Sequence, residues 1–98
     1  MDVAHSVKGV PIRLSYERWY HIVENHDDLA GCFHDVLNTI ESPEFVARGS
    51  HGALKAVRSM GKKKWIVVLY REMSKRDGFV LTAYFLSRKP KGEVVWQP

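Results

Sequence analysis

Apolar positions in the first part of the chain recur with the period of a helix. Four residues occupy positions i, i+3, i+4 and i+7, which share one helix face: Trp19, Ile22, Val23 and His26. Ser15 is a suitable N-cap, and the acidic pair Asp27-Asp28 would be unfavourable at the negative end of a helix. The pattern therefore predicts a first helix that starts after Ser15 and stops near His26.

A second stretch has the same period. Its apolar positions are Phe33, Val36, Leu37 and Ile40. We predict a second amphipathic helix over roughly 29–41, with Asp28 as its cap and Gly31 as a break or tight contact. Ser42-Pro43 ends it, because the residue before proline avoids the helical region.

The remaining apolar segments read as strands. A short strand over 10–14 is expected at a sheet edge because of Pro11. Four more strands are predicted at 44–48, 53–59, 64–71 and 79–86, with Asp77-Gly78 as a strong turn signal. Their connections are too short for crossovers, so they should form an antiparallel meander.

These elements predict an α+β fold, with two N-terminal helices packed on a four-stranded antiparallel β-meander. The chain has 98 residues, which suits a single domain over 1–98. Residues 1–9 and 92–98 are expected to be flexible ends.

Charge is distributed unevenly along the chain. The formal net charge is +4, but residues 1–47 carry three basic and eight acidic side chains, whereas residues 48–98 carry twelve basic and three acidic ones. The acidic half coincides with the helices and the basic half with the meander. This asymmetry predicts a cationic sheet face and a polyanionic partner, most simply RNA.

Other classes are disfavoured. No apolar run approaches the roughly 18 residues of a membrane span, and Met1 to His5 lacks the features of a signal peptide. The single cysteine, Cys32, excludes an internal disulfide, so we expect a reduced, cytoplasmic protein. His21 and His26 are five residues apart, not the four of paired helical zinc ligands, and we predict no metal and no cofactor.

The basic residues on or beside the predicted strands are candidates for contact with phosphates. An antiparallel sheet covered by helices on one face leaves the other to solvent, where cations would attract a nucleic-acid backbone. The predicted nucleic-acid-binding residues are Arg48, Arg58, Lys64, Arg88, Lys89 and Lys91. The alternative is that lysines in turns, as at 62–64, only solvate those turns.

His26 is the sharpest candidate for chemistry. It lies on the apolar stripe of the first helix, so it should point toward the sheet, and the negative helix end favours its imidazolium form. Such a group suits general acid or base catalysis. The alternative is a histidine at the edge of the core that is bonded to a backbone carbonyl.

The long strands supply further candidates. Strict alternation places Val80, Thr82 and Tyr84 on one side of the last strand and Leu81, Ala83 and Phe85 on the other. Tyr70 and Glu72 share a side of the preceding strand, and Arg71, which ends an apolar strand, needs a partner or a ligand. A tyrosine can stack on a base or donate to a phosphate, or it can be half-buried with its hydroxyl in water.

Several stretches in this order carry a resemblance to a known group. They are His21 to His26 in the first helix, Ser42-Pro43-Glu44 after the second, Val67 to Glu72, and Gly78 to Phe85. Over about residues 12–91 the chain resembles small phage- and bacterium-associated nuclease domains of the barnase–EndoU–colicin–RelE-like group. The resemblance implies a helical start followed by an antiparallel sheet, and metal-independent RNA cleavage by in-line attack of a ribose 2′-hydroxyl.

The resemblance also implies roles for individual residues. His26 would be the helix histidine, Arg71 or Arg48 the phosphate-stabilising arginine, and Thr82 and Tyr84 the hydroxyls of the last strand. The chain lacks a second well-placed histidine. One of three other groups would have to complete the acid–base pair: Tyr70, Glu72 or Lys89. The predicted catalytic set is therefore His26, Arg71, Thr82, Tyr84 and Tyr70.

Two functions from different classes follow. The first is a small ribonuclease, free-standing or the toxin of a toxin–antitoxin pair, with RNA as substrate and an acidic antitoxin or immunity protein as partner. The second is a non-catalytic module that binds nucleic acid or an acidic protein through the same basic sheet face. Either is expected to work without a membrane, as a monomer or a homodimer.

Overall fold

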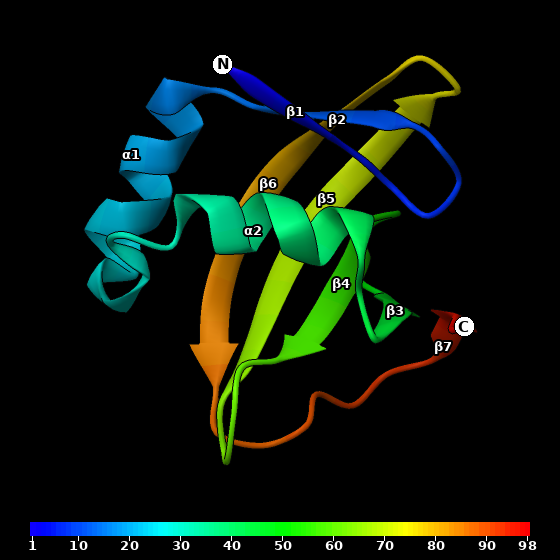
Figure 1. Ribbon diagram of the computed structural model, residues 1–98. Coiled ribbons are helices and arrows are strands. Elements are labelled where there is room, and N and C mark those ends of the chain that lie inside the picture. Colours follow the sequence, from blue (N-terminus) through cyan, green and yellow to red (C-terminus); the bar gives the residue numbers. More distant parts are fainter.

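The computed structural model describes residues 1–98 and contains two α-helices, one 3₁₀ helix and seven strands in one sheet (Figure 1). The elements in chain order are β1 (Asp2–His5), β2 (Pro11–Leu14), α1 (Tyr16–Asn25), η1 (Asp27–Leu29), α2 (Phe33–Glu41), β3 (Phe45–Arg48), β4 (Leu54–Ser59), β5 (Trp65–Ser74), β6 (Asp77–Leu86) and β7 (Val94–Trp96). The α+β class is as predicted. Neither helix is long and apolar enough to cross a membrane.

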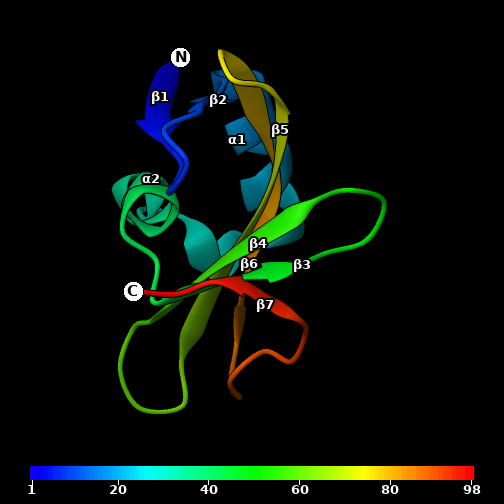
Figure 2. The same cartoon turned by 90° about the vertical axis from the view of Figure 1, so that its right-hand side faces the viewer.

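The sheet is not the four-stranded antiparallel meander that we expected. Its order is β1-β2-β6-β5-β4-β3-β7, and it is mixed, because β2 runs parallel to β6. The strand with Pro11, which we expected at an edge, is β2 and has β1 and β6 on its two sides. The successive strands β3 to β6 do pair antiparallel. The two terminal segments that we expected to be flexible ends supply the edge strands β1 and β7 (Figure 2). Such short segments form strands only because they pair with segments distant in the chain. A local pattern of apolar residues does not reveal this pairing.

The helices are built largely from local signals. The Ser15 side chain caps α1 by accepting a hydrogen bond from the backbone N–H of Arg18, and the helix ends at His26 as predicted. The second helix begins at Phe33 and not near residue 29. Its N-cap is Cys32 and not Asp28, which lies in η1. Gly31, with φ +83°, explains the difference, because a left-handed residue interrupts the helix.

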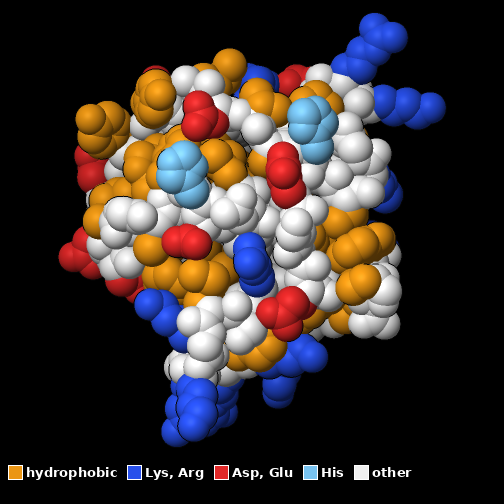
Figure 3. Space-filling model, in the orientation of Figure 1, with side chains coloured by type: hydrophobic (Ala, Val, Ile, Leu, Met, Phe, Trp, Pro, Cys, Tyr) orange, Lys and Arg blue, Asp and Glu red, His pale blue; other side chains and the backbone are white.

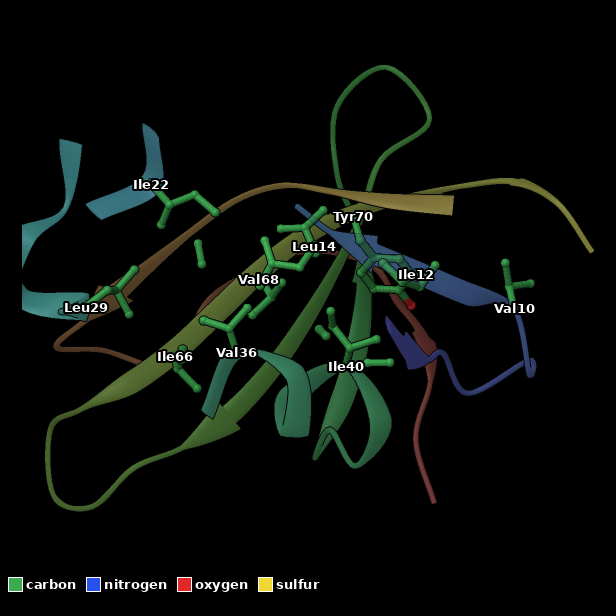
Figure 4. Packing of buried hydrophobic residues seen from close by; sticks show 14 residues of the cluster. Val10, Ile12, Leu14, Ile22, Leu29, Val36, Ile40, Ile66, Val68 and Tyr70 are labelled. Atoms are coloured by element: carbon green, nitrogen blue, oxygen red, sulfur yellow. The ribbon is translucent and has the colours of Figure 1, made fainter. Parts of the chain in front are cut away.

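The main core lies between the helices and one face of the sheet (Figure 4). Ile22 and Leu29 enter it from α1 and η1, and Val36 and Ile40 enter it from α2. The strands contribute Ile12, Leu14, Ile66, Val68, Tyr70, Val80 and Ala83, among others. A smaller cluster of Phe45, Ala47, Val57 and Val67 lies on the opposite face. The middle of β5 is therefore apolar on both sides.

A β-bulge interrupts the alternation of β6. Leu69 pairs with Thr82 and Tyr70 pairs with Val80, so Leu81 has no partner on β5. An unpaired extra residue shifts the side-chain phase of a strand by one position. Val80 consequently joins Ala83 in the main core instead of sharing a face with Thr82 and Tyr84, which corrects the expected alternation.

Gly78 marks the closest approach between strands. A Cβ built at Gly78 would lie 2.5 Å from the backbone oxygen of Arg71 and 2.6 Å from Cδ1 of Ile12. Gly78 pairs with both Ile12 of β2 and Glu72 of β5, so any side chain there would separate the strands.

We expect Gly78→Ala to lower the free energy of unfolding by about 2 kcal/mol or more, because the new methyl group overpacks this junction. Gly31→Ala is the control: its Cβ meets no atom, so it should cost only about 1 kcal/mol for the left-handed backbone. Urea denaturation of both variants measures the difference. Equal losses would show that β2 and β6 do not approach as closely as the structure has them.

Candidate functional site

The sheet face opposite the helices carries cations, aromatic rings and hydroxyls. The strand register and the side-chain alternation place seven half-buried residues there: Lys55, Trp65, Leu69, Arg71, Phe79, Thr82 and Tyr84. We call this surface the open face. It is the face of the sheet that the helices do not cover (Figure 1), and its centre is the buried cluster of Phe45, Ala47, Val57 and Val67.

His26 lies beside the open face. It is the C-cap residue of α1, which runs next to the outer edge of β6 (Figure 1). The centroid of its ring is 5.9 Å from that of Tyr84, with the ring planes inclined at 42°. Burial raises the pKa of the Tyr84 hydroxyl above its ordinary value of 10.0, so the hydroxyl stays protonated and can donate a hydrogen bond. A half-buried imidazole and a phenol donor thus stand together.

Thr82 and Arg71 lie on the same face, at increasing distances from Tyr84. Thr82 is two residues from Tyr84 on the same side of β6, about 7 Å along the strand. Arg71 pairs with Phe79, four residues along β5 from the partner of Tyr84, or about 13 Å away. The Arg71 guanidinium lies near the β3–β4 turn, 3.6 Å from where a Cβ on Gly52 would stand, and forms no ion pair.

Tyr70 lies on the other side of the sheet. Its side chain is fully buried in the main core, and its hydroxyl has no hydrogen-bond partner. Glu72 faces the same way and accepts a hydrogen bond from the Ser6 hydroxyl. The sheet therefore separates Tyr70 and Glu72 from the pair formed by His26 and Tyr84. Lys89 is the one expected acid–base partner that the structure leaves on the open side.

Three of the predicted nucleic-acid-binding residues follow β6 in one exposed loop. Lys89 covers one end of the open face, with its ammonium 5.2 Å from the ring centroid of Phe45 and 6.0 Å from that of Trp65. The Lys91 carbonyl accepts a hydrogen bond from the Lys55 ammonium at 3.1 Å. Arg88 is exposed in the same loop.

The other three lie elsewhere. Arg58 pairs with Ile66 and so faces the helix-covered side of the sheet. Lys64 lies over the ring of Phe85, which packs against the main core. Arg48 is held in an ion pair with Glu93 at 2.9 Å. The predicted single cationic face is thus only partly formed, because β-strand alternation divides the basic residues between both sides.

Three residues of the open face are not in the predicted set of site residues: Lys55, Trp65 and Phe79. Each alternates along its strand with a residue of the main core: Ala56, Ile66 and Val80 respectively. Alternation relative to a known core position would have found them. Without the register, the face to which each strand turned its polar side was undetermined.

The helix-covered side differs in charge. Figure 3 shows acidic side chains spread over this side, with most Lys and Arg side chains extending from its margins. The helical segment from Tyr16 to Glu41 contains six acidic residues and one basic residue, Arg18. No three His, Cys, Asp or Glu side chains lie together in a way that could hold a metal ion. The basic side chains therefore lie mainly outside the helical segment.

The burial of Tyr70 makes the stability of the fold fall at alkaline pH. Burial and the nearby Glu72 carboxylate raise the pKa of Tyr70 well above its ordinary value of 10.0. The unfolded chain releases this proton near pH 10 while the folded chain keeps it, so stability is lost as the pH rises above that value.

We expect Tyr70→Phe to reduce the loss of unfolding free energy between about pH 8 and about pH 11, because phenylalanine has no proton to release. Tyr16→Phe, at a side chain 61% exposed, should leave that loss unchanged. Urea denaturation at the two pH values is the measurement. The same alkaline loss in both variants would contradict the burial of the Tyr70 hydroxyl.

Comparison with models of protein families, with curated proteins and with solved structures finds no match. The function of this fold must therefore be argued from the chemistry of its site, because a fold alone does not determine an activity.

Proposed function

We propose that this protein is a metal-independent endoribonuclease that cleaves RNA held across the open face. The observation that carries the proposal is the His26 ring next to Tyr84, on a surface that also presents the cations Lys55, Arg71 and Lys89. Cations alone would indicate binding. A half-buried histidine and a protonated phenol at the same face add the groups that a cleavage reaction needs.

The substrate would be a single strand. Trp65, Phe79 and Tyr84 are half-buried rings spaced along neighbouring strands of the open face. Unpaired bases can stack on such rings, whereas the bases of a duplex are already stacked on one another. The cations would lie along the phosphate backbone, with Lys89 at one end of the face and Arg71 at the other.

The chemistry would be an in-line transfer within the RNA. His26 takes the proton from a 2′-hydroxyl, whose oxygen then bonds to the adjacent phosphorus. The bond from phosphorus to the 5′ oxygen breaks, which leaves a 2′,3′-cyclic phosphate and a free 5′-hydroxyl. Tyr84 donates a hydrogen bond to the phosphorane oxygens, and a water molecule supplies the proton that the leaving 5′ oxygen takes up.

The other predicted residues would have supporting roles. Thr82, next to Tyr84, orients the reacting ribose or phosphate. Arg71 is about 13 Å along the sheet from the Tyr84 level, so it would hold a neighbouring phosphate and not the reacting one. The proposal includes a cytoplasmic location. An acidic antitoxin or immunity protein that covers the open face would inhibit the enzyme.

We expect the purified protein to cut a single-stranded oligoribonucleotide in EDTA and to leave a fully 2′-deoxy version intact. His26→Ala should lower the cleavage rate about 100-fold or more, and Tyr84→Phe about 10-fold or more, because each removes a group that acts in the transition state. His21→Ala is the matched control, since His21 is exposed on the same helix. Gel analysis of end-labelled RNA gives the rates.

Cleavage that disappears in EDTA, or that His26→Ala and His21→Ala affect equally, would contradict this mechanism. Circular dichroism of each variant shows whether its fold is retained.

A second function is the binding of RNA without cleavage. It is favoured because the predicted catalytic residues lie far apart on the sheet. Arg71 and the pair of His26 and Tyr84 are far apart for one reaction, and Tyr70 lies across the sheet. Binding alone needs the cations and rings of the open face and no acid–base pair.

Under either function, RNA affinity should fall as salt rises. Replacing Arg71 by glutamine should weaken binding and reduce the slope of log affinity against log salt by about 0.7, the value for one contact with a single strand. Arg18→Gln removes the same charge from α1 and should leave the slope unchanged. Fluorescence anisotropy measures the affinity and the salt slope of both variants, with a 2′-deoxy oligonucleotide that cannot be cleaved. Equal effects of the two changes would contradict binding on the open face.

A further inference from the structure

A cavity lies at the end of the sheet that neither helix covers. Its volume is about 60 Å³. It is lined by Val46, Leu54, Tyr70 and Glu72 from the helix-covered side of the sheet, by Val7 and Lys8 from the β1–β2 turn, and by Val95 and Trp96 from β7. The edge strand β7 and the β1–β2 turn thus close a space that the helices leave open. The cavity is on the opposite side of the sheet from the open face.

Tyr70 brings an unsatisfied polar group to this cavity. Tyr70 is fully buried, and its hydroxyl has no hydrogen-bond partner in the protein. Figure 4 shows the Tyr70 side chain next to Ile12, extending toward the C-terminal strand. A buried hydroxyl without a partner costs free energy, so native proteins rarely retain one unless water or a ligand satisfies it.

Glu72 brings an unneutralised charge. Its carboxylate accepts a hydrogen bond from the Ser6 hydroxyl, but no Lys, Arg or His forms an ion pair with it. The Glu72 carboxylate is also close enough to Tyr70 to help raise the pKa of its hydroxyl. The cavity therefore has the Glu72 carboxylate at its polar end and Lys8 at its rim, and its remaining walls are apolar and aromatic.

We propose that this cavity binds a primary alkylammonium group. The ammonium would donate hydrogen bonds to the Glu72 carboxylate and to the Tyr70 oxygen, and its short alkyl chain would contact the valine side chains. The rings of Tyr70 and Trp96 favour a cation, because aromatic faces carry a negative potential. The volume corresponds to only a few non-hydrogen atoms, so the ligand is a small amine or the end of one longer side chain.

Lys8 is the competitor within the chain. It lines the cavity, is exposed, and has no ion-pair partner. Its ammonium weakens the attraction of Glu72 for an incoming cation. Removal of this charge should therefore tighten the binding of an amine.

The test uses n-propylammonium chloride as the probe, at constant ionic strength, with the Trp96 indole N–H followed by NMR. We expect a saturable shift with a millimolar dissociation constant, as befits a ligand with so few atoms. The neutral probe n-propanol should bind at least about 10-fold more weakly, because the charge interaction with Glu72 is lost. Propionate should cause no shift.

Variants assign the binding to the two polar groups. Tyr70→Phe should weaken propylammonium binding about 5-fold, the effect of one hydrogen bond, and Tyr16→Phe should not change it. Glu72→Gln keeps an acceptor for Ser6 but should abolish the preference for propylammonium over propanol. Lys8→Met should strengthen binding.

One further probe distinguishes the source of the amine. A stronger shift with a short lysine-containing peptide than with propylammonium would identify a protein side chain as the ligand, and the reverse would identify a free small amine. The proposal is overturned if no probe gives a saturable shift, if propanol or propionate binds as well as propylammonium, or if Glu72→Gln leaves the preference intact. None of these readouts depends on RNA.

Discussion

The pairing of β5 with β6 is the interaction on which the other features depend. These are the two ten-residue strands, and the central part of β5 is buried on both faces. One side of the pair supports the helices and lines the cavity at Tyr70 and Glu72, and the other side forms the open face. The bulge at Leu81 shifts the alternation of β6 by one residue. Val80 and Ala83 can therefore both lie in the main core while Thr82 and Tyr84 lie on the open face. Each proposed site is thus a consequence of the phase of one strand relative to its neighbour.

Charge is separated less completely than the division of the chain suggests. The helical layer is acidic, and the turns are basic, but β-strand alternation sends successive basic residues to opposite faces. Arg58 and Lys55, three residues apart on β4, illustrate this division. The open face keeps few cations, and three of them, Lys55, Arg71 and Lys89, frame its aromatic residues. The proposed RNA substrate would therefore be attracted by the overall field and positioned by a small number of contacts.

Parts of the site were accessible from the amino-acid sequence because their causes are local. The spacing from Trp19 to His26 predicts that His26 turns toward the sheet, and its ring does reach Tyr84. The i, i+2 relation of Thr82 and Tyr84 predicts their common face. Tyr70 could not be placed in this way. A tyrosine in an apolar strand suits either face, and only the pairing partners and the position of α2 determine which face is buried.

The sequence by itself determined the class of the fold, both helices with the cap at Ser15, and the succession of strands from β3 to β6. These features arise from interactions between residues a few positions apart, where periodicity and capping act. The tertiary structure alone decided the parallel pairing of β2 with β6, the recruitment of both terminal segments as edge strands, the bulge, and the enclosure of the Tyr70 hydroxyl. Each of these depends on contacts between segments far apart in the chain, and such contacts leave no period in the local pattern.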